Sequence, residues 1–490
     1  MAVSACGGDT NVQQPVVPSA IEVVQGQGQS GLVGSALPTP LGVKVTDGSG
    51  NPAPGVTITW SGVSGGGTVS PAASVTDANG VTSTQYTLGP AEGEQQAEAT
   101  GTGLTGSPVV FTETATTSPG PVPTVLSVAA GGNNVPDRYS SDLWVHGNYA
   151  YTGTWGSIPR QEDKPGDVIN VWSLDPSGAP SLVSTVTVGD ITNLSDLQVS
   201  DDGQLLVASG EYGINGGIYV YGLSDPAHPS LLGRDTVGIR GVHTVTLATI
   251  NQRLYAFAAL NPGFSGDETE DMPGLLIYDL SQPQSPTLVH REPIPPHYGI
   301  HDTYVRDGIA FVFAWDEGVI IYDVGNGLKG GSPSAPVKIS QIVTASNGAG
   351  TPAAHNGWWF HNPVSGESRY LFVGQEGPGE VGARSSGDIH VVDVSDLSHP
   401  AEVAFFHING AGTHNFWMDE EKQILYAAYY NAGVIALDVS GTLSGNLSNR
   451  LLSKIQPGGA RNTFTWGVQL ANGSLYAIDM LSGFWQLRTE

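Results

Sequence analysis

The sequence predicts an all-β protein, in which a small β-sandwich precedes a larger domain built from repeats. Of its 490 residues, 67 are Gly and 33 are Pro, and only 13% are charged. Short runs of Val, Ile, Tyr and Thr alternate with Gly, Asn, Asp and Pro throughout, which is typical of many short strands joined by tight turns. A chain of this length is expected to form more than one domain.

The chain is strongly acidic. It has 18 Lys and Arg against 45 Asp and Glu, a formal net charge of −27. Such a charge repels phosphate backbones, so we expect no nucleic-acid partner. The acidic residues are spread along the chain, which favours a soluble, self-repelling surface. A calcium-binding surface is the alternative, but the ligand spacings of EF-hand and RTX loops are absent.

The single cysteine lies close to the N-terminus, so neither an internal disulfide nor a Cys-rich zinc site is expected. Cys6 follows Val-Ser-Ala and precedes Gly-Gly-Asp, and this segment resembles a bacterial lipobox. The resemblance implies that Cys6 is acylated and that residues 1–19 form a lipobox and flexible tether. The protein would then be extracytoplasmic and held at a membrane by its lipid anchor alone. A chance Ala-Cys-Gly is the alternative.

Residues 20–118 are expected to form the sandwich. Strand-like runs occupy residues 20–24, 41–46 and 56–60, and turn sequences occupy residues 47–52 and 76–80. This spacing fits an Ig-like fold. The phrases VTDGSGNPAPGV and TDANGV resemble bacterial Ig-like domains of the invasin/intimin type, which implies a spacer or adhesive module. We favour a spacer because no titratable groups cluster there, and residues 119–123 are interpreted as a Pro-rich linker.

Two phrases repeat through residues 124–490. The first is a strand with Tyr-Ala or a similar pair, and the second is an apolar strand that follows it after a short loop. The first begins at residues 149, 205, 255, 310, 370, 426 and 476, and the second at 168, 217, 274, 318, 388, 433 and 483. A period of roughly 50 residues is typical of propeller blades of four strands. Seven copies predict a seven-bladed β-propeller over residues 124–490.

The ends of this repeat predict how the propeller closes. The last copy stops after its third strand, whereas the strand-like residues 124–129 precede the first copy without a partner. We expect these two segments to pair, because closure removes a sheet edge that would invite aggregation.

The second phrase carries a family resemblance. GLLIYDLS at residues 274–281 and GVIIYDV at residues 318–324 resemble the LVIVD repeat of bacterial and archaeal secreted propellers. This resemblance extends over residues 124–490 and implies an architecture more than an activity.

Alignment of the expected inner strands suggests a ring of polar side chains. Because inner strands surround the axis of a propeller, equivalent positions should meet at one mouth of the channel. Four neutral imidazoles meeting there would suit Cu, Fe or Zn. The aligned positions are Asp142, Asp196, His243, His301, His355, His414 and Trp466. Of these, His243, His301, His355 and His414 are the candidate metal ligands, and the other three are candidate binding residues.

The loops after the second strands should reach the same mouth. Glu211, Glu376 and Asp316 are candidate catalytic residues there, because carboxylates can orient imidazoles or act as acid and base. The additional binding residues expected at the mouth are His297, Trp315, Tyr430 and Asn431.

A structural interpretation of the ring stays open. A His or Asp at this place belongs to the repeat itself, and its side chain can serve only to bond the backbone of the next blade. A metal-free binding site is a further alternative. We interpret Trp358-Trp359 and Phe416-Trp417 as packing between blades. The remaining histidines, which lie in expected turns or outer strands and should be solvated, are His146, His228, His290, His390, His399 and His407.

Two functions follow from these alternatives. Selenium-binding-protein-type methanethiol oxidases and carotenoid cleavage oxygenases hold copper or iron with histidines at a propeller axis. The similarity is one of architecture and histidine placement, and it implies a metal-dependent oxidoreductase. The alternative is a non-catalytic surface protein whose propeller mouth captures a small molecule, glycan, peptide or protein.

Overall fold

The computed structural model describes residues 16–116, 124–156, 164–174, 178–236, 241–261, 273–294, 299–345 and 352–490. Cys6 and His297 therefore lie outside the described residues. The described chain is all-β, apart from one 3₁₀ turn, η1 (Ser448–Arg450). Within these ranges, no helix is long and apolar enough to cross a membrane. The chain divides into two compact units, residues 1–120 and 121–490.

The N-terminal unit is a β-sandwich of two sheets. One sheet has the order β1 (Pro18–Gln25), β3 (Leu41–Asp47), β7 (Val81–Thr87) and β5 (Thr68–Ser70). The other has the order β2 (Ser30–Leu32), β9 (Val109–Thr116), β8 (Gly93–Thr100), β4 (Thr57–Gly62) and β6 (Ala73–Val75).

Both sheets contribute to one apolar core. Val43 from one sheet and Trp60 and Phe111 from the other belong to the same buried cluster. Two expected turns are closed by aspartates, whose carboxylates accept backbone N–H bonds two and four residues ahead. Asp47 bonds Ser49 and Asn51, and Asp77 bonds Asn79 and Val81.

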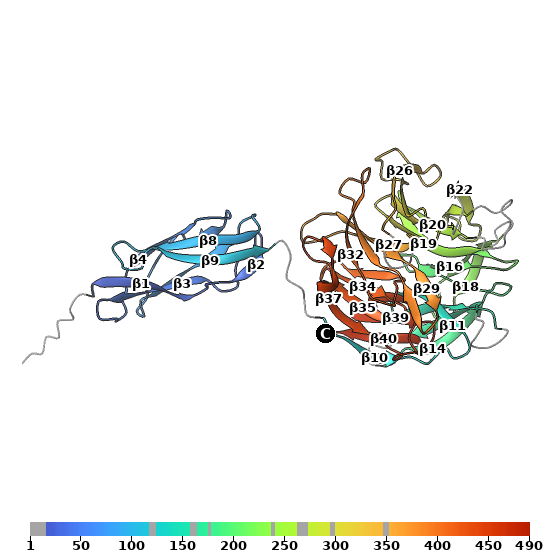
Figure 1. The fold of residues 1–490 in the computed structure, drawn as a ribbon, viewed down its shortest axis with the longest axis horizontal. Helices are drawn as coiled ribbons and strands as arrows, with labels where there is room; N and C mark the ends of the chain where they lie inside the picture. The colour runs from blue at the N-terminus through green and yellow to red at the C-terminus, as the bar shows by residue number, and fades with distance from the viewer. Residues whose placement is uncertain are drawn as a thin grey trace, which may run out of the picture. The chain divides into compact units, whose positions relative to one another are not determined.

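The C-terminal unit is a β-propeller built from consecutive sheets whose strands pair antiparallel, apart from the parallel pair of β32 and β36 (Figure 1). The first three are β11 (Tyr139–His146), β12 (Tyr149–Trp155), β13 (Val168–Ser173) and β14 (Ser181–Thr187); β15 (Leu197–Val199), β16 (Leu205–Gly210), β17 (Gly217–Gly222) and β18 (Ser230–Asp235); and β19 (Val242–Ile250), β20 (Arg253–Leu260), β21 (Gly274–Asp279) and β22 (Thr287–Pro293).

Four further sheets complete the unit, which makes seven within the described residues. They are β23 (Asp302–Arg306), β24 (Ile309–Phe313), β25 (Val319–Asp323) and β26 (Val337–Ile342); β27 (Ala354–Phe360), β28 (Tyr370–Gln375), β31 (Ile389–Asp393), β32 (Ala401–Phe406) and β36 (Gly445–Asn446); β33 (Phe416–Asp419), β34 (Ile424–Ala428), β35 (Val434–Asp438) and β37 (Leu451–Ile455); and β38 (Thr465–Ala471), β39 (Ser474–Asp479), β40 (Gly483–Thr489) and β10 (Leu126–Gly131). A small hairpin, β29 (Gly377–Glu380) and β30 (Arg384–Ser386), lies between β28 and β31.

The first strands of the seven sheets surround a common axis. Each of them contacts the first strand of the next sheet, and β38 of the last sheet contacts β11 of the first. We call β11, β15, β19, β23, β27, β33 and β38 the inner strands. Their side chains therefore define a central channel.

The ring closes between its two ends, which confirms the expected pairing. β10 pairs antiparallel with β40, with Leu126 opposite Thr489 and Val128 opposite Leu487. Leu126 is 6% exposed and shares a buried cluster with Leu487. The last sheet thus obtains its fourth strand from the start of the unit.

We predict that Leu126→Ala lowers the free energy of unfolding by about 2 kcal/mol, because it removes a buried side chain from this closing strand. Thermal unfolding followed by circular dichroism measures the change. Val125→Ala is the matched control, since Val125 is 60% exposed and should change little. Equal effects of the two substitutions would contradict the closing role of β10.

A buried aspartate fixes the loop after β25. The Asp323 carboxylate accepts N–H bonds from Gly325 at 3.0 Å, Asn326 at 2.9 Å and Lys329 at 2.6 Å. Burial raises the pKa of Asp323, but these donors, Lys329 first, outweigh it and bring the pKa to about 2.

Because this pKa lies below its unfolded value, the ionised carboxylate stabilises the fold above about pH 4, and this stability is lost as the pH falls through about 2. We predict that Asp323→Asn lowers the free energy of unfolding at pH 7 by about 1–3 kcal/mol. The difference from the parent protein should shrink between pH 4 and pH 2 in denaturant titrations. Asp201→Asn, at an exposed position, is the control. A pH-independent difference would disprove this assignment.

Candidate metal centre at the propeller axis

A β-bulge near the start of four of the inner strands brings two consecutive residues to the axis. The pairing with the second strand shifts between Ser140 and Leu143 in β11 and between Val242 and Val245 in β19. β27 and β38 show a register shift at the equivalent place. The first positions form the histidine layer, which consists of Ser141, Ser195, His243, His301, His355, His414 and Trp466. The second positions form the carboxylate layer, which consists of Asp142, Asp196, Thr244, Asp302, Asn356, Asn415 and Gly467.

The expected alignment of Asp142 and Asp196 with the histidines is therefore wrong by one residue. Both aspartates line the same cavity as Asp302, Asn356 and Asn415, whereas His243 and His301 line a different one. The residues that share the histidine layer are instead their predecessors in the sequence, Ser141 and Ser195.

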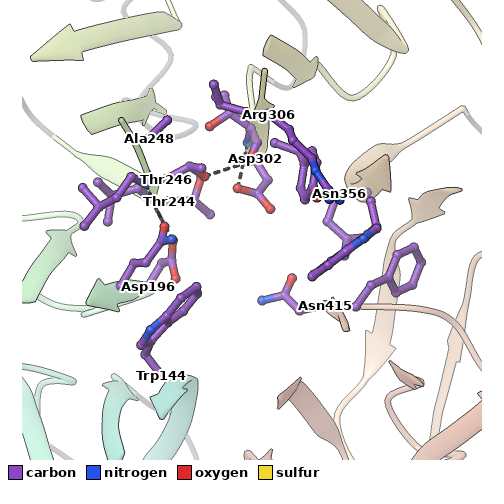
Figure 2. A pocket seen from close by; sticks show the side chains of 18 of the residues that line it. Trp144, Asp196, Thr244, Thr246, Ala248, Asp302, Arg306, Asn356 and Asn415 are labelled. Carbon is purple, nitrogen blue, oxygen red and sulfur yellow. Dashed lines mark hydrogen bonds between the residues drawn. The ribbon is translucent and has the colours of Figure 1, made fainter. Parts of the chain in front are cut away.

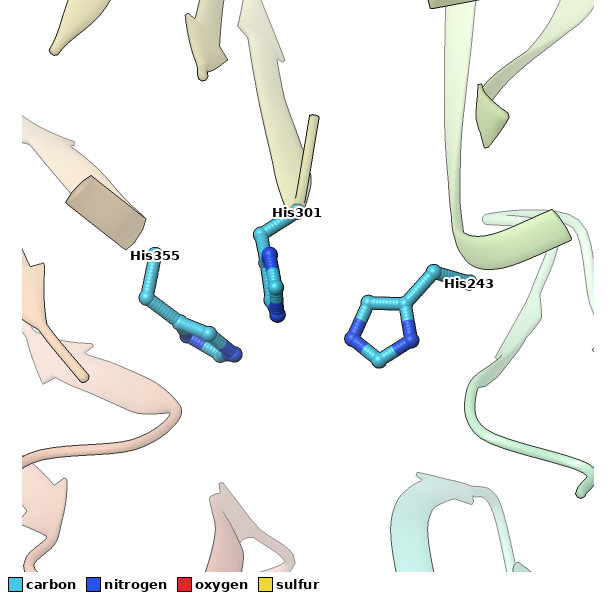
Figure 3. A group of neighbouring side chains, drawn as sticks. All are labelled: His243, His301 and His355. Atoms are coloured by element: carbon cyan, nitrogen blue, oxygen red, sulfur yellow. The ribbon is translucent and has the colours of Figure 1, made fainter. Parts of the chain in front are cut away.

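The four histidines lie side by side on four consecutive sheets, as the sequence suggested. Their ring centroids are 4.5 Å apart between His243 and His301, 5.0 Å between His301 and His355, and 4.2 Å between His355 and His414. Figure 3 shows three of these imidazoles turned toward a common space.

The nitrogens form two overlapping groups of ligand size. In one, ligand atoms of His243, His301 and His355 all lie within 4.8 Å of one another. In the other, His355, His414 and the Glu376 carboxylate do so. His355 is common to both. The arrangement can hold a metal ion without bringing all four imidazoles to one point.

Glu211 fixes the orientation of His243. Its Oε1 lies 2.6 Å from His243 Nδ1, and its Oε2 accepts a bond from Ser195 Oγ at 2.6 Å. Both residues are buried. Burial disfavours the imidazolium, but the charge of Glu211 outweighs it and raises the pKa of His243 to about 9. A carboxylate on Nδ1 leaves Nε2 facing the centre, which is the usual support of a metal-bound histidine.

Glu376 lies at the middle of the group. Its Oε2 is 3.4 Å from His301 Nε2 and 3.7 Å from His355 Nε2, and its Oε1 accepts a hydrogen bond from the Tyr430 hydroxyl. Burial raises the pKa of Glu376 to about 7, although the Tyr430 hydroxyl acts in the opposite direction. This carboxyl can therefore hold or release a proton near neutral pH.

The other three imidazoles are neutral and incompletely bonded. Burial lowers the pKa of His355 to about 3, and it lowers the pKa values of His301 and His414 well below the ordinary value. His414 Nδ1 lies 2.7 Å from the carbonyl oxygen of Trp466. The buried atoms His301 Nδ1, His355 Nδ1 and His414 Nε2 have no hydrogen-bond partner. Neutral imidazoles with free nitrogens are the form that binds metals.

A cavity of about 380 Å³ opens beside the histidines. Its walls are mostly apolar and aromatic, and its polar groups come from the histidine layer and the loops after the second strands. It is lined by Trp155, Tyr212, His243, Asn261, His301, Trp315, Glu376, Pro378, Val381, Tyr430, Phe464, Trp466 and Met480.

The backbone is strained at this mouth. Tyr212, Trp315 and Tyr430 have φ values of 49°, 50° and 39°, in the left-handed region that large side chains seldom adopt. Each follows or ends a second strand and lines the cavity. Such strain is retained where the surrounding structure enforces it, and it concentrates at functional sites.

Other expected residues lie elsewhere. Asp316 follows Trp315 but is not among the residues that line the cavity. Asn431 accepts a bond from Ser385 Oγ at 2.6 Å and donates to the carbonyl of Gly410 at 2.9 Å, so it braces loops outside the cavity. His390 was expected to be solvated, but it is fully buried in β31.

Several lining residues were missed from the sequence. Trp155, Asn261 and Met480 end or follow second strands and are thus equivalent in place to Glu376. The repeated first phrase marks the strands that precede them and could have located them.

The comparisons agree with a repeated β architecture. The LVIVD repeat matches residues 137–158, which contain β11 and β12, and residues 383–407, which contain β30 to β32. The fold and these repeats define the class, a β-propeller that contains LVIVD repeats. No curated protein matches the chain.

Solved structures were also found. Sqt1 of Chaetomium thermophilum is 13% identical over 72% of this chain and 86% of its own, with a TM-score of 0.47. The β-propeller domain of Cps50 (Swd1) from Myceliophteria thermophila is 14% identical over 74% and 98%, with a TM-score of 0.49. Sqt1 bound to the N-terminus of the ribosomal protein L10 is 14% identical over 74% and 90%, with a TM-score of 0.47.

Proposed function

We propose that the histidine layer holds a transition metal, and that the protein is a metal-dependent oxidoreductase acting at the adjacent cavity. The observation that carries this proposal is the pair of ligand groups that share His355. Their donors are imidazole nitrogens and one carboxylate, which suit Cu, Fe or Zn more than Ca or Mg. Three of the imidazoles are neutral, and each keeps a buried nitrogen atom without a partner.

The residues around the centre have distinct roles in this proposal. His243, His301, His355 and His414 supply the ligand set, and Glu211 orients His243. When bound, a redox-active metal would supply electron transfer to or from a molecule in the cavity. Glu376 and Tyr430 share a proton next to that position, so they can accept or return one during turnover. The aromatic walls exclude water from the reacting molecule.

A non-catalytic binding protein is the second candidate. The contact of His414 Nδ1 with the carbonyl of Trp466 favours it, because this is the bond to a neighbouring sheet that a purely structural histidine would make. In this proposal the mouth captures a small molecule, glycan, peptide or protein, and the histidines only shape it.

The wider organisation is part of the proposal. We infer that the seven sheets are the blades of a seven-bladed propeller over residues 124–490, and that residues 20–118 are an Ig-like spacer. Residues 119–123 would link the two. Residues 1–19, with Cys6 acylated, would tether the protein to a membrane outside the cytoplasm. The two-sheet core of the N-terminal unit and the lipobox-like segment support this view.

We predict that protein reconstituted separately with Cu, Fe or Zn and then desalted retains about one ion per chain, and that His355→Ala abolishes this retention. His355 belongs to both ligand groups, so its loss dismantles each. Elemental analysis by mass spectrometry measures the ratio. His399→Ala is the control, because the side chain of His399 is 82% exposed. Protein that retains no metal, or a variant that retains as much as the parent, would favour the second candidate.

We also predict that Glu211→Gln weakens metal binding by about 10- to 100-fold, because the amide no longer holds His243 with a charged acceptor. Competition against a chromophoric chelator measures the affinity. The exposed Asp396→Asn is the control. Unchanged affinity in the Gln variant, with the fold intact by circular dichroism, would remove His243 from the ligand set.

A further inference from the structure

The cavity of about 380 Å³ beside the histidine layer lies at the axis of the ring. Each of the seven sheets contributes to its lining, through its inner strand, the end of its second strand or the loop that follows. Sites for small organic molecules usually have volumes of roughly 300–1,000 Å³. The cavity therefore has room for an organic molecule beside a metal ion.

The charges of the lining favour an uncharged ligand. Among the described residues that line this cavity, none is Lys or Arg. Anionic ligands are usually held by such side chains or by the N-terminus of a helix, so an anion would lose its hydration here without gaining a partner. The one lining carboxyl group, that of Glu376, already contacts His301 and accepts a hydrogen bond from Tyr430, so a cation would have to compete with both.

Aromatic rings line the cavity on opposite sides of the axis. Trp315 belongs to the fourth sheet of the ring, and two sheets separate it from each of the sheets that carry Trp155 and Trp466. The rings of Trp155 and Trp466 contact each other, with centroids 5.1 Å apart, and the ring of Trp315 lies 4.3 Å from that of His301. A flat group between these walls can contact aromatic rings on both of its faces.

The carboxyl group of Glu376 provides a polar contact within the aromatic walls. Its Oε1 accepts a hydrogen bond from Tyr430, whereas its Oε2 accepts none from the described residues and has His301 Nε2 at 3.4 Å. A hydroxyl group can both donate and accept a hydrogen bond, so it can pair with this oxygen whether the carboxyl group is ionised or protonated. An ammonium group can only donate, and an ether oxygen can only accept.

The hairpin β29–β30 partly covers the cavity. It adds Pro378 and Val381 to the lining. A Cβ atom added to Gly382 would lie 2.9 Å from Leu481 Cδ1, so the turn of the hairpin reaches the loop between β39 and β40 of the last sheet. The hairpin thus extends from the fifth sheet toward the seventh, and this cover suits a small molecule more than a polymer.

We propose that this cavity binds an uncharged, flat, bicyclic aromatic compound that carries a hydroxyl group. Its rings lie between Trp315 on one side and Trp155 and Trp466 on the other, and its hydroxyl group pairs with Glu376 Oε2. Such a compound would be the substrate of the metal centre, a role that rests on the proposed function, whereas its binding can be measured without a metal.

The other cavity of the channel supplies a matched control. It has a volume of about 440 Å³, is lined by residues of the carboxylate layer (Figure 2), and shares no lining residue with the first cavity. Trp144 lines this other cavity and is partly buried, like Trp155. Trp358 and Trp417, which were expected to pack between blades, line it as well.

The test titrates the metal-free full chain at pH 7 with 2-naphthol, followed by isothermal titration calorimetry. The comparison compounds are 2-naphthoate, which is anionic, 2-(aminomethyl)naphthalene, which is cationic, 2-methoxynaphthalene, which cannot donate, and decahydro-2-naphthol, which is not flat. 2-Naphthol should bind at least about tenfold more tightly than each of them, which corresponds to about 1.4 kcal/mol. Absence of 2-naphthol binding, or equal binding of any comparison compound, would overturn the proposal.

Variants locate the binding. Trp155→Ala should weaken 2-naphthol binding about tenfold, Trp144→Ala should bind like the parent, and Glu376→Leu should abolish the preference for 2-naphthol over 2-methoxynaphthalene. Equal binding by the two tryptophan variants, or an unchanged preference in Glu376→Leu, would overturn the proposal. Protein that binds 2-naphthol with these preferences but retains no metal would contradict the oxidoreductase and leave the binding site in place. Protein that retains metal but does not bind 2-naphthol would overturn the binding site alone.

Discussion

The bulge at the start of the inner strands is the constraint on which the channel depends. In a regular strand, consecutive side chains point to opposite faces, so only every second residue would reach the axis. The extra residue lets two neighbours in the sequence reach it together. His243 and Thr244, or His355 and Asn356, thus contribute to two layers at once. Ring closure by β10 and β40 holds the seven inner strands at the distance that makes these layers continuous.

A sequence pattern predicts those parts of the fold and the site that depend on local residues or on equivalent positions in the repeat. The strands were predictable because alternation and turn residues are local, and ring closure followed from a strand missing at one end and spare at the other. The histidine ring was also predictable, since equivalent positions converge. The placement of Asp142 and Asp196 was not, because a bulge shifts the register by one residue and alignment by phrases does not detect it. The exposure of Trp358 to the channel likewise depends on which face the bulge presents.

The two layers give the channel two chemistries within one residue of each other. On one side, burial keeps His301 and His355 neutral, and the Nδ1 atom of each ring has no hydrogen-bond partner. On the other, burial raises the pKa values of Asp196 and Asp302, that of Asp302 to about 8. Neutral imidazole nitrogens suit a transition metal, and the buried carboxyl groups form a separate layer beside them. The histidine layer and the carboxylate layer require no additional domain, because neighbouring residues of the same inner strands supply both.

A functional site in a repeat protein can be recognised where equivalent positions carry different residues. A structural residue that is part of the repeat is expected to recur in each sheet. The loops after the second strands occupy equivalent places, yet they present three different types of side chain, in Glu211, Trp315, Glu376 and Tyr430. The sheet that carries Glu376 is also the one with the inserted hairpin β29–β30, which begins directly after this residue and brings Pro378 to the cavity. If these loop residues served only to hydrogen-bond the next sheet, the same residue type would be expected at the equivalent position of each sheet. These loops vary around the point where Glu376 contacts two histidines and a tyrosine. The variation favours a functional role for these residues over a purely structural one.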